Sequence, residues 1–276
     1  MSKLTPEDVV LRYSKRGMNV LKKYLKDGYC RTAAEKLLHA ERGTVLLTTG
    51  FYVAGYAETD GPLGTVAVAE ALNHLGFHSV VVTDKYCKGF FELKQLDVEY
   101  VDIAADEQVY EAILDKYNPV YMISIERCGE NAEHEYANMR GVSITSETAA
   151  IDHLFELAPE KHIPTIGVGD GGNEIGMGNV KDIISEKLEL NPCVVPVDDL
   201  IIATTSNWGA YALTAWLQKL SGEEVLFTFA EAEPYLAATL EIGSVDGVLK
   251  EKKMGVDGFD MTVEKEILDS LAEAIA

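Results

Sequence analysis

The chain has 276 residues, 47% of them apolar and 25% charged, a balance that suits one α/β domain with a full core. Its formal charge of −21 disfavours nucleic acids and anionic membranes as partners, because both reward clusters of Lys and Arg. No apolar run is long enough for a transmembrane helix, and residues 1–8 lack the apolar core of a signal peptide.

Helical spacing of leucines predicts two helices between residues 6 and 40, separated near Gly28. After them, short β-rich runs alternate with amphipathic segments. The runs predict strands over residues 44–52, 79–83, 98–103, 120–125, 163–168 and 200–204. The amphipathic segments predict helices over residues 65–75, 108–117, 146–157, 208–220 and most of 231–276, with an interruption over 243–258.

This alternation implies a mainly parallel sheet with helices on both faces, a Rossmann-like three-layer α/β fold. The run Val80-Val81-Val82 has no polar alternation, as expected for a strand that is buried on both sides. We expect one domain over residues 1–276, with residues 1–42 as a helical N-terminal accessory and residues 43–276 as the core.

Residues 167–180 form the most informative segment, with six glycines, two carboxylates and two carboxamides directly after a predicted strand. Glycines let backbone N–H groups approach a ligand closely. Asp170, Asn173 and Glu174 supply acceptors and a proton carrier. Two carboxylates argue against a simple phosphate cradle and favour a metal ion or an ammonium group.

Other polar segments also follow predicted strands, over residues 55–64, 126–141 and 204–209. In an open parallel sheet, ligands bind outside the carboxyl ends of the strands. Segments that are far apart in the sequence are therefore expected to meet at one edge and to form an active site.

Each of these segments also has a purely structural interpretation. Thr59 or Asp60 is a plausible helix cap, and so is the Ser206-Asn207 pair. Arg127 and Arg140 have surface ion pairs as their alternative to ligand binding.

The sequence motifs of several common catalytic and binding sites are absent. There is no G-x-S-x-G elbow, no His-based metal motif and no complete dinucleotide-binding loop, so no organic cofactor is expected. The four cysteines form no CxxC pair, which favours a reduced, cytoplasmic location.

Taken together, five motifs resemble the D-glutamate cyclase family, in its C-terminal catalytic domain. They are Glu58-Thr59-Asp60-Gly61-Pro62-Leu63-Gly64, Glu126-Arg127, Tyr136-Ala137-Asn138-Met139-Arg140-Gly141, residues 169–178 and Ser206-Asn207-Trp208-Gly209. The match runs from about Gly50 to the end, and Val256-Asp257-Gly258 is a further family-like element. One departure is Cys128, where the family usually has proline.

The resemblance implies a lyase that dehydrates D-glutamate to 5-oxo-D-proline. Arg127 or Arg140 is then expected to hold the α-carboxylate. Asp170, Glu174 and Asp60 are expected to bind a divalent cation, Mn²⁺ or Mg²⁺, that polarises the γ-carboxylate, and Glu174 or Glu58 to take the ammonium proton. The remaining substrate contacts are expected from Asn173, Asn207, Gly171, Gly172, Asn138, Ser206 and Thr59. A metal-free version, with one buried carboxyl as the acid, stays open.

Two other functions remain as alternatives. One is a metal-assisted lactam or amide hydrolase that uses the same groups in reverse. The other is a non-catalytic sensor of an amino acid or a nucleotide. In the favoured interpretation the partner is a small anionic amino acid, with no nucleic acid and no membrane. The oligomeric state stays open, with a homodimer as one alternative.

Overall fold

Six parallel strands form the central sheet of the computed structural model, which describes residues 4–276. Residues 1–3 lie outside the described residues. They belong to the predicted N-terminal helical segment and to residues 1–8, for which no signal peptide is expected. The strands are β1 (Thr44–Thr49), β4 (His78–Thr83), β5 (Asp97–Tyr100), β6 (Tyr121–Ile125), β7 (Thr165–Gly169) and β8 (Asp199–Ile202).

The strand order is β5-β4-β1-β6-β7-β8, and every neighbouring pair is parallel. The chain thus moves outward from β1 to β5, crosses back to β6 beside β1, and then moves outward in the other direction. All residues of β6 and β7 are buried, which explains their continuous apolar character. The reversal of direction between β1 and β6 is the place where an open sheet of this order usually binds its ligand.

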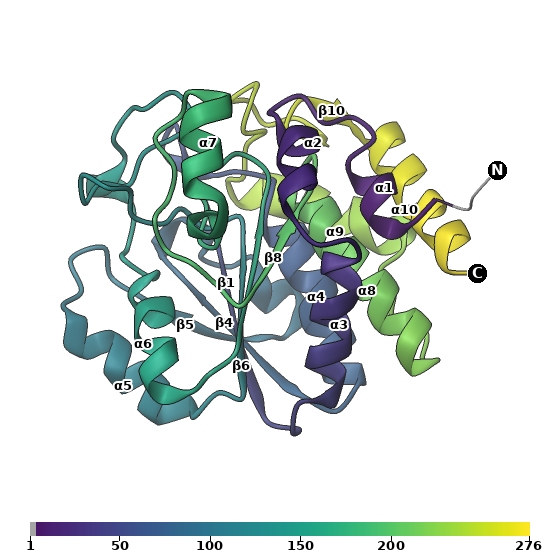
Figure 1. The fold of residues 1–276 in the computed structure, drawn as a ribbon, viewed down its shortest axis with the longest axis horizontal. Coiled ribbons are helices and arrows are strands. Elements are labelled where there is room, and N and C mark those ends of the chain that lie inside the picture. Colours follow the sequence, from purple (N-terminus) through teal and green to yellow (C-terminus); the bar gives the residue numbers. More distant parts are fainter. Residues whose placement is uncertain (1–3) are drawn as a thin grey trace.

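Helices cover both faces of the sheet (Figure 1). On one face, α4 and α8 pack against each other and α3 packs beside α8, whereas α5 and α6 pack together on the opposite face. The three-layer Rossmann-like prediction is therefore confirmed. The bounds of these helices are α3 (Tyr29–His39), α4 (Pro62–His74), α5 (Glu107–Tyr117), α6 (His153–Lys161) and α8 (Ser206–Ser221).

The N-terminal segment is divided more finely than predicted. It contains α1 (Pro6–Val10), α2 (Met18–Leu21), a short 3-10 turn η1 (Lys22–Tyr24) and α3, with a break over residues 11–17. It is not an appendage, because α3 packs on β8 and the Thr204 N–H donates to the Val10 carbonyl at 2.8 Å. The predicted helical N-terminal accessory is therefore packed against the core of the domain. The division of the chain into domains stays a prediction.

The C-terminal part contains α9 (Phe229–Ile242) and α10 (Met261–Ile275), separated by the loop that the sequence predicted. Within that loop, β9 (Gly255–Val256) and β10 (Phe259–Asp260) form a two-stranded antiparallel ribbon. Glu264 of α10 is buried and accepts hydrogen bonds from Trp208 Nε1 and Tyr211 Oη of α8. This contact fixes the C-terminal helix against the body of the domain, beside α1 (Figure 1).

Local structure departs from the prediction in three places. The helix predicted over residues 146–157 is η4 (Thr145–Glu147) followed by α6, which begins after Asp152. The Asp152 carboxylate accepts from Glu130 N and Tyr136 Oη. The ribbon formed by β2 (Tyr52–Val53) and β3 (Tyr56–Ala57) and the helix α7 (Lys181–Leu188) were not predicted. Three further 3-10 turns are η2 (Lys85–Cys87), η3 (Phe91–Lys94) and η5 (Met177–Val180).

Within residues 4–276, no helix has both the length and the apolar character needed to cross a membrane.

Candidate active site

Asp60 is held between the N-termini of two helices. Its Oδ1 accepts from Asn207 N at 2.7 Å and its Oδ2 from Ser206 N at 2.8 Å, so the first residues of α8 bind the carboxylate. The partial positive charge of a helix N-terminus stabilises an anion there. α4 begins immediately after Asp60 and approaches α8 so closely that a Cβ on Gly64 would lie 2.8 Å from Ala210 Cβ.

Glu126 follows β6 in a left-handed conformation with φ of 50°, which is uncommon for a residue with a side chain. This turn sends the carboxylate to the edge of the sheet, where Oε2 accepts from Ser206 Oγ. The following loop pairs with the glycine-rich loop, since Ile175 N donates to Arg127 O and Gly129 N to Asn173 O. Glu126 is therefore placed next to Asp170.

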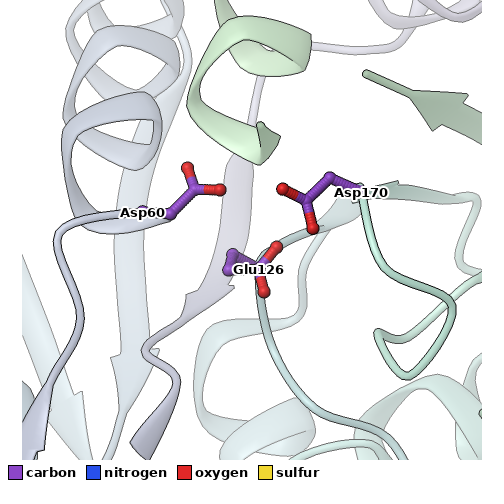
Figure 2. Close-up of side chains that lie close together, drawn as sticks. All are labelled: Asp60, Glu126 and Asp170. Carbon is purple, nitrogen blue, oxygen red and sulfur yellow. The ribbon is translucent and has the colours of Figure 1, made fainter. Parts of the chain in front are cut away.

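Asp60, Glu126 and Asp170 form a buried group, here called the carboxylate triad (Figure 2). One oxygen from each residue lies within 4.8 Å of the other two. Asp170 Oδ2 is buried and has no hydrogen-bond partner among the described residues. Carboxylate oxygens in this arrangement fit a hard divalent cation such as Mg²⁺ or Mn²⁺.

The triad differs from the predicted metal ligands in one residue. Asp60 and Asp170 are brought together as expected, but Glu126 takes the place assigned to Glu174. Both oxygens of Glu174 are bound by its own loop: Oε1 accepts from Gly171 N and Oε2 from Gly172 N, each at 2.7 Å. In this geometry Glu174 therefore binds its own loop, as do the Gly171 and Gly172 N–H groups, and their assignment to metal and substrate stays a prediction.

Close packing of acidic groups perturbs their protonation. Burial, with Asp257 as the next cause, raises the pKa of Asp60 to about 8. Burial and the charge of Asp170 raise the pKa of Glu126 well above its ordinary value. Burial also raises the pKa of Asp170, although the charge of Arg16 opposes part of that rise. The triad thus favours either a bound cation or a bound proton.

Arg16 supplies a cation to the site that the sequence did not reveal. Its Nη1 lies 2.7 Å from Asp170 Oδ1 and 2.8 Å from Asp257 Oδ2. Burial works against its charged form, but Asp170, Asp257 and Glu126 outweigh that effect and raise the pKa of the guanidinium. Arg16 stands in a basic, leucine-rich segment, so nothing in its neighbourhood distinguishes it from a surface residue. Asp257, in contrast, belongs to Val256-Asp257-Gly258, which the sequence identified as a family-like element.

A cavity of about 420 Å³ opens beside the triad. Glu126 and Asp170 line it together with Glu58, Glu174 and Asp257, and its basic residues are Arg16, Arg140 and Lys250. Arg140 and Lys250 are exposed, whereas the five acidic residues are largely buried. The cavity therefore combines an acidic interior with exposed cations near solvent, and Asn138 and Asn173 add amide groups to its wall.

Glu58 lies where the sequence predicted, at the end of the first βα loop and facing the cavity. Only 6% of the residue is exposed, and its carboxylate has no hydrogen bond or ion pair among residues 4–276. Burial, Asp257 and Asp60 raise the pKa of Glu58 well above its ordinary value. Asn173 also lines the cavity, but its Nδ2 donates to Ala137 O at 2.8 Å.

Arg127 lies outside the cavity, contrary to the clamp prediction. Its guanidinium is buried and donates to Asp84 Oδ2 at 2.6 Å, Gly50 O at 2.8 Å and Ala149 O at 2.6 Å. Burial lowers its pKa, but Asp84 more than compensates, so the pKa of Arg127 is raised overall. This side chain joins three loops behind the site and is not available to a substrate.

Thr59 and Asn207 are also structural in this geometry. Thr59 Oγ1 donates to Gly255 O at 2.8 Å, and Asn207 Oδ1 accepts from the N–H groups of Gly61 and Gly64. Neither residue lines the cavity, so the structure does not bring them to the candidate substrate site. Asn207 does not cap its own helix, because Thr205 is the N-cap of α8; its side chain binds the N-terminus of α4 instead. Ser206 acts on the triad through Glu126 and Asp60 instead of lining the cavity.

Comparison with known proteins identifies similar sequences. A family model described as D-glutamate cyclase-like, C-terminal, matches residues 7–272. A human protein named D-glutamate cyclase, mitochondrial, is 32% identical over 261 residues, which covers 80% of this chain and 40% of the human protein. The chain thus spans about two fifths of the length of that relative, whose name is that of an enzyme.

Two solved structures show a distant likeness. UDP-glucose 4-epimerase from Brucella ovis, in complex with NAD, has a TM-score of 0.34 and 14% identity over 54% of this chain and 49% of its own. The Bordetella bronchiseptica enzyme WbmG, in complex with NAD and UDP, has a TM-score of 0.32 and 13% identity over 74% and 61% of the respective chains. Scores this low support no inference about ligand or reaction.

Proposed function

This chain belongs to the D-glutamate cyclase-like, C-terminal family, and we propose that it is a carbon–oxygen lyase that converts D-glutamate to 5-oxo-D-proline. The carboxylate triad carries this proposal, because it places unpartnered Asp170 Oδ2 in a buried acidic group at one end of a cavity with basic residues at its mouth. A substrate with an ammonium group and two carboxylates complements that distribution of charge.

The reaction makes definite demands on the site. The amine nitrogen forms a bond to the γ-carboxyl carbon, and one carbon–oxygen bond of that carboxylate breaks. The nitrogen loses two protons and the departing oxygen gains two, so water leaves with no net proton exchange. A catalyst must therefore fold the substrate, take a proton from nitrogen and neutralise the attacked carboxylate.

Each demand has a residue in the cavity. We assign the α-carboxylate to Arg140, because its guanidinium is exposed at the cavity wall whereas that of Arg127 is consumed elsewhere. We assign the proton transfer from nitrogen to Glu58, since its carboxylate faces the cavity without a partner, whereas Glu174 is bound by loop N–H groups. Asn138 and Asn173 complete the wall.

Asp60, Glu126 and Asp170 are the residues that would hold Mn²⁺ or Mg²⁺. When bound, such an ion supplies Lewis-acid polarisation of the γ-carboxylate. The alternative uses no metal: one triad carboxyl keeps a proton and donates it to the departing oxygen. The raised pKa of Glu126 and of Asp170 supports that version as well.

The test is incubation of purified protein with D-glutamate and L-glutamate, each with Mn²⁺, with Mg²⁺ and after chelation, followed by mass spectrometry. Loss of one water from D-glutamate alone is the expected result. Turnover of L-glutamate alone, or of neither, contradicts the proposal. Undiminished activity after complete metal removal selects the acid route.

Two further reactions are checked in the same experiment. Hydrolysis of 5-oxoproline without any cyclisation of glutamate would identify a lactam hydrolase. A thermal shift with D-glutamate in the absence of product would identify a sensor.

The remaining assignments are parts of the same proposal. The partner is a small anionic amino acid and the cofactor at most a divalent metal ion, while a homodimer stays a prediction. We also propose a cytoplasmic location. All four cysteines are buried and free of disulfides, as a reducing compartment permits.

A further inference from the structure

We propose that Glu58 and Asp257 form a subsite for the substrate's ammonium group, and that this subsite selects an amino acid over the corresponding hydroxy acid. The inference deepens the proposed function and rests on it for the choice of D-glutamate as ligand. It adds Asp257 and Gly247 to the residues that recognise substrate.

Glu58 and Asp257 come from distant parts of the chain and meet beside Gly247. A Cβ added to Gly247 would lie 1.9 Å from Glu58 Oε2 and 3.1 Å from Asp257 Oδ1. Glu58 Oε2 therefore takes the place that a side chain on residue 247 would fill, and Asp257 Oδ1 lies across a small space from it. All three residues line the cavity.

Neither oxygen that faces this space has a hydrogen-bond partner among the described residues. Among residues 4–276 the Glu58 carboxylate has no hydrogen-bond partner, although only 6% of the residue is exposed. The Asp257 side chain is only 4% exposed, and its one ion pair among residues 4–276 joins Oδ2 to Arg16, which leaves Oδ1 toward Glu58. Two buried carboxylates in this state are stabilised by a cation between them or by a shared proton.

The backbone holds this geometry in place. The Asp246 carboxylate is fully buried; Oδ1 accepts from Val248 N at 3.0 Å, and Oδ2 accepts from Gly258 N at 2.8 Å. One side chain thus ties the turn at Gly247 to the turn that carries Asp257. Asp257 itself adopts a left-handed φ of 53°, a conformation that needs such support.

An ammonium group fits this space better than a second divalent cation. Three N–H donors match two acceptor oxygens and leave one donor for a neighbour. A divalent ion of this kind takes about six oxygen ligands, more than the pair offers, and the Arg16 cation already lies on Asp257 Oδ2. A hydroxyl group in place of the ammonium would bring no positive charge to Glu58 or to the Asp257 oxygen that faces it.

The experiment compares binding of D-glutamate and D-2-hydroxyglutarate by calorimetry in the cold, with Mn²⁺ present. We expect wild-type protein to prefer D-glutamate by about 10-fold or more, as for hydrogen bonds to charged groups. In Asp257→Asn, which keeps the shape and removes the charge, the preference should fall to about 2-fold or less. Affinity for the hydroxy acid should stay close to wild type.

A second variant and a control guard against a folding defect. Gly247→Ala places a methyl group where Glu58 Oε2 lies, so it should reduce the same preference without removing any charge. Asp182→Asn, an exposed site on α7, should leave the preference unchanged. Wild-type protein that binds both ligands equally overturns the inference, as does equal weakening of both ligands in Asp257→Asn.

The outcomes separate this inference from the proposed reaction. A wild-type preference for the amine that Asp257→Asn abolishes supports the subsite even when no 5-oxoproline forms. Cyclisation of D-glutamate by a protein whose Asp257→Asn variant still discriminates against the hydroxy acid overturns the subsite and leaves the reaction standing. A second Mn²⁺ bound in wild type and lost in Asp257→Asn would show that the pair holds metal instead.

Discussion

Arg16 Nη1 lies 2.7 Å from Asp170 Oδ1, although 154 residues separate them in the chain. The contact joins the N-terminal segment to the glycine-rich loop at the centre of the candidate site. Asp257, from the C-terminal loop, binds the same nitrogen. Three segments from the two ends and the middle of the chain are thus held together by one guanidinium, which offsets part of the negative charge of the cavity.

Replacement of Arg16 should destabilise the metal-free protein. Arg16→Gln removes the cation from two largely buried carboxylates, and we expect the free energy of unfolding in urea to fall by about 3 kcal/mol. Added Mn²⁺ should restore part of that loss, because it supplies positive charge to the triad. The control is Arg12→Gln, whose ion pair with Glu266 is partly exposed, with a loss of under about 1 kcal/mol. Equal small losses in both variants would contradict this account.

The triad predicts which substitutions weaken both metal binding and turnover. Glu126→Gln and Asp170→Asn should each lower turnover by about 100-fold and raise the dissociation constant of Mn²⁺ by about 10-fold or more. Mass spectrometry of 5-oxoproline and titration of Mn²⁺ by electron paramagnetic resonance give the two readouts. Wild-type turnover in both variants would remove the triad from the mechanism.

Glu174→Gln should behave differently, because Glu174 binds loop N–H groups instead of facing a metal. An amide offers one acceptor oxygen where the carboxylate offers two, so at least one buried N–H group loses its partner. We expect a loss of about 1–3 kcal/mol in stability, seen as a lower melting temperature. A large loss of Mn²⁺ affinity with an unchanged melting temperature would restore Glu174 as a ligand.

The two arginines that the sequence offered as clamps are separable by experiment. Arg127→Gln breaks a buried ion pair with Asp84 and should cost about 3–5 kcal/mol of stability. Arg140→Gln should change stability by less than about 0.5 kcal/mol and raise KM for D-glutamate by about 10-fold. The assignment of the clamp is wrong if Arg140→Gln leaves KM at its wild-type value.

Stability should depend on pH through Glu264, which lies away from the triad. Burial raises its pKa, and hydrogen bonds from Trp208 and Tyr211 oppose part of that rise. The folded state therefore holds this proton more tightly, so the contribution of Glu264 is complete below about pH 4.3 and is lost as pH rises through the raised value. Relative to Glu264→Gln, which resembles the protonated form, wild-type protein should lose stability over that range. Parallel profiles from urea unfolding at several pH values would contradict the assignment.

The layers of the fold follow from local pattern. Apolar runs and helical periodicity predict all six strands of the main sheet and the helices α4, α5 and α8 to within a few residues. Those features depend on neighbours in the sequence, so one chain is enough to recognise them. The same local logic places Glu58, Asp60 and Asp170 after strands, where the sheet topology brings them to one edge.

The direction of individual side chains was decided by tertiary structure. Glu126 and Arg127 are adjacent, yet a left-handed turn sends Glu126 into the triad while Arg127 points into the protein toward Asp84. Glu174 looked like a ligand and instead closes its own loop.

By itself, therefore, the sequence determined the parallel α/β architecture, the edge at which the site lies and the family to which the chain belongs. Only the tertiary structure decided which carboxylates share the triad and that Arg16 reaches it. The physical reason is that periodic burial is encoded over a few neighbouring residues, whereas charge pairing depends on backbone turns and on contacts between segments far apart in the chain.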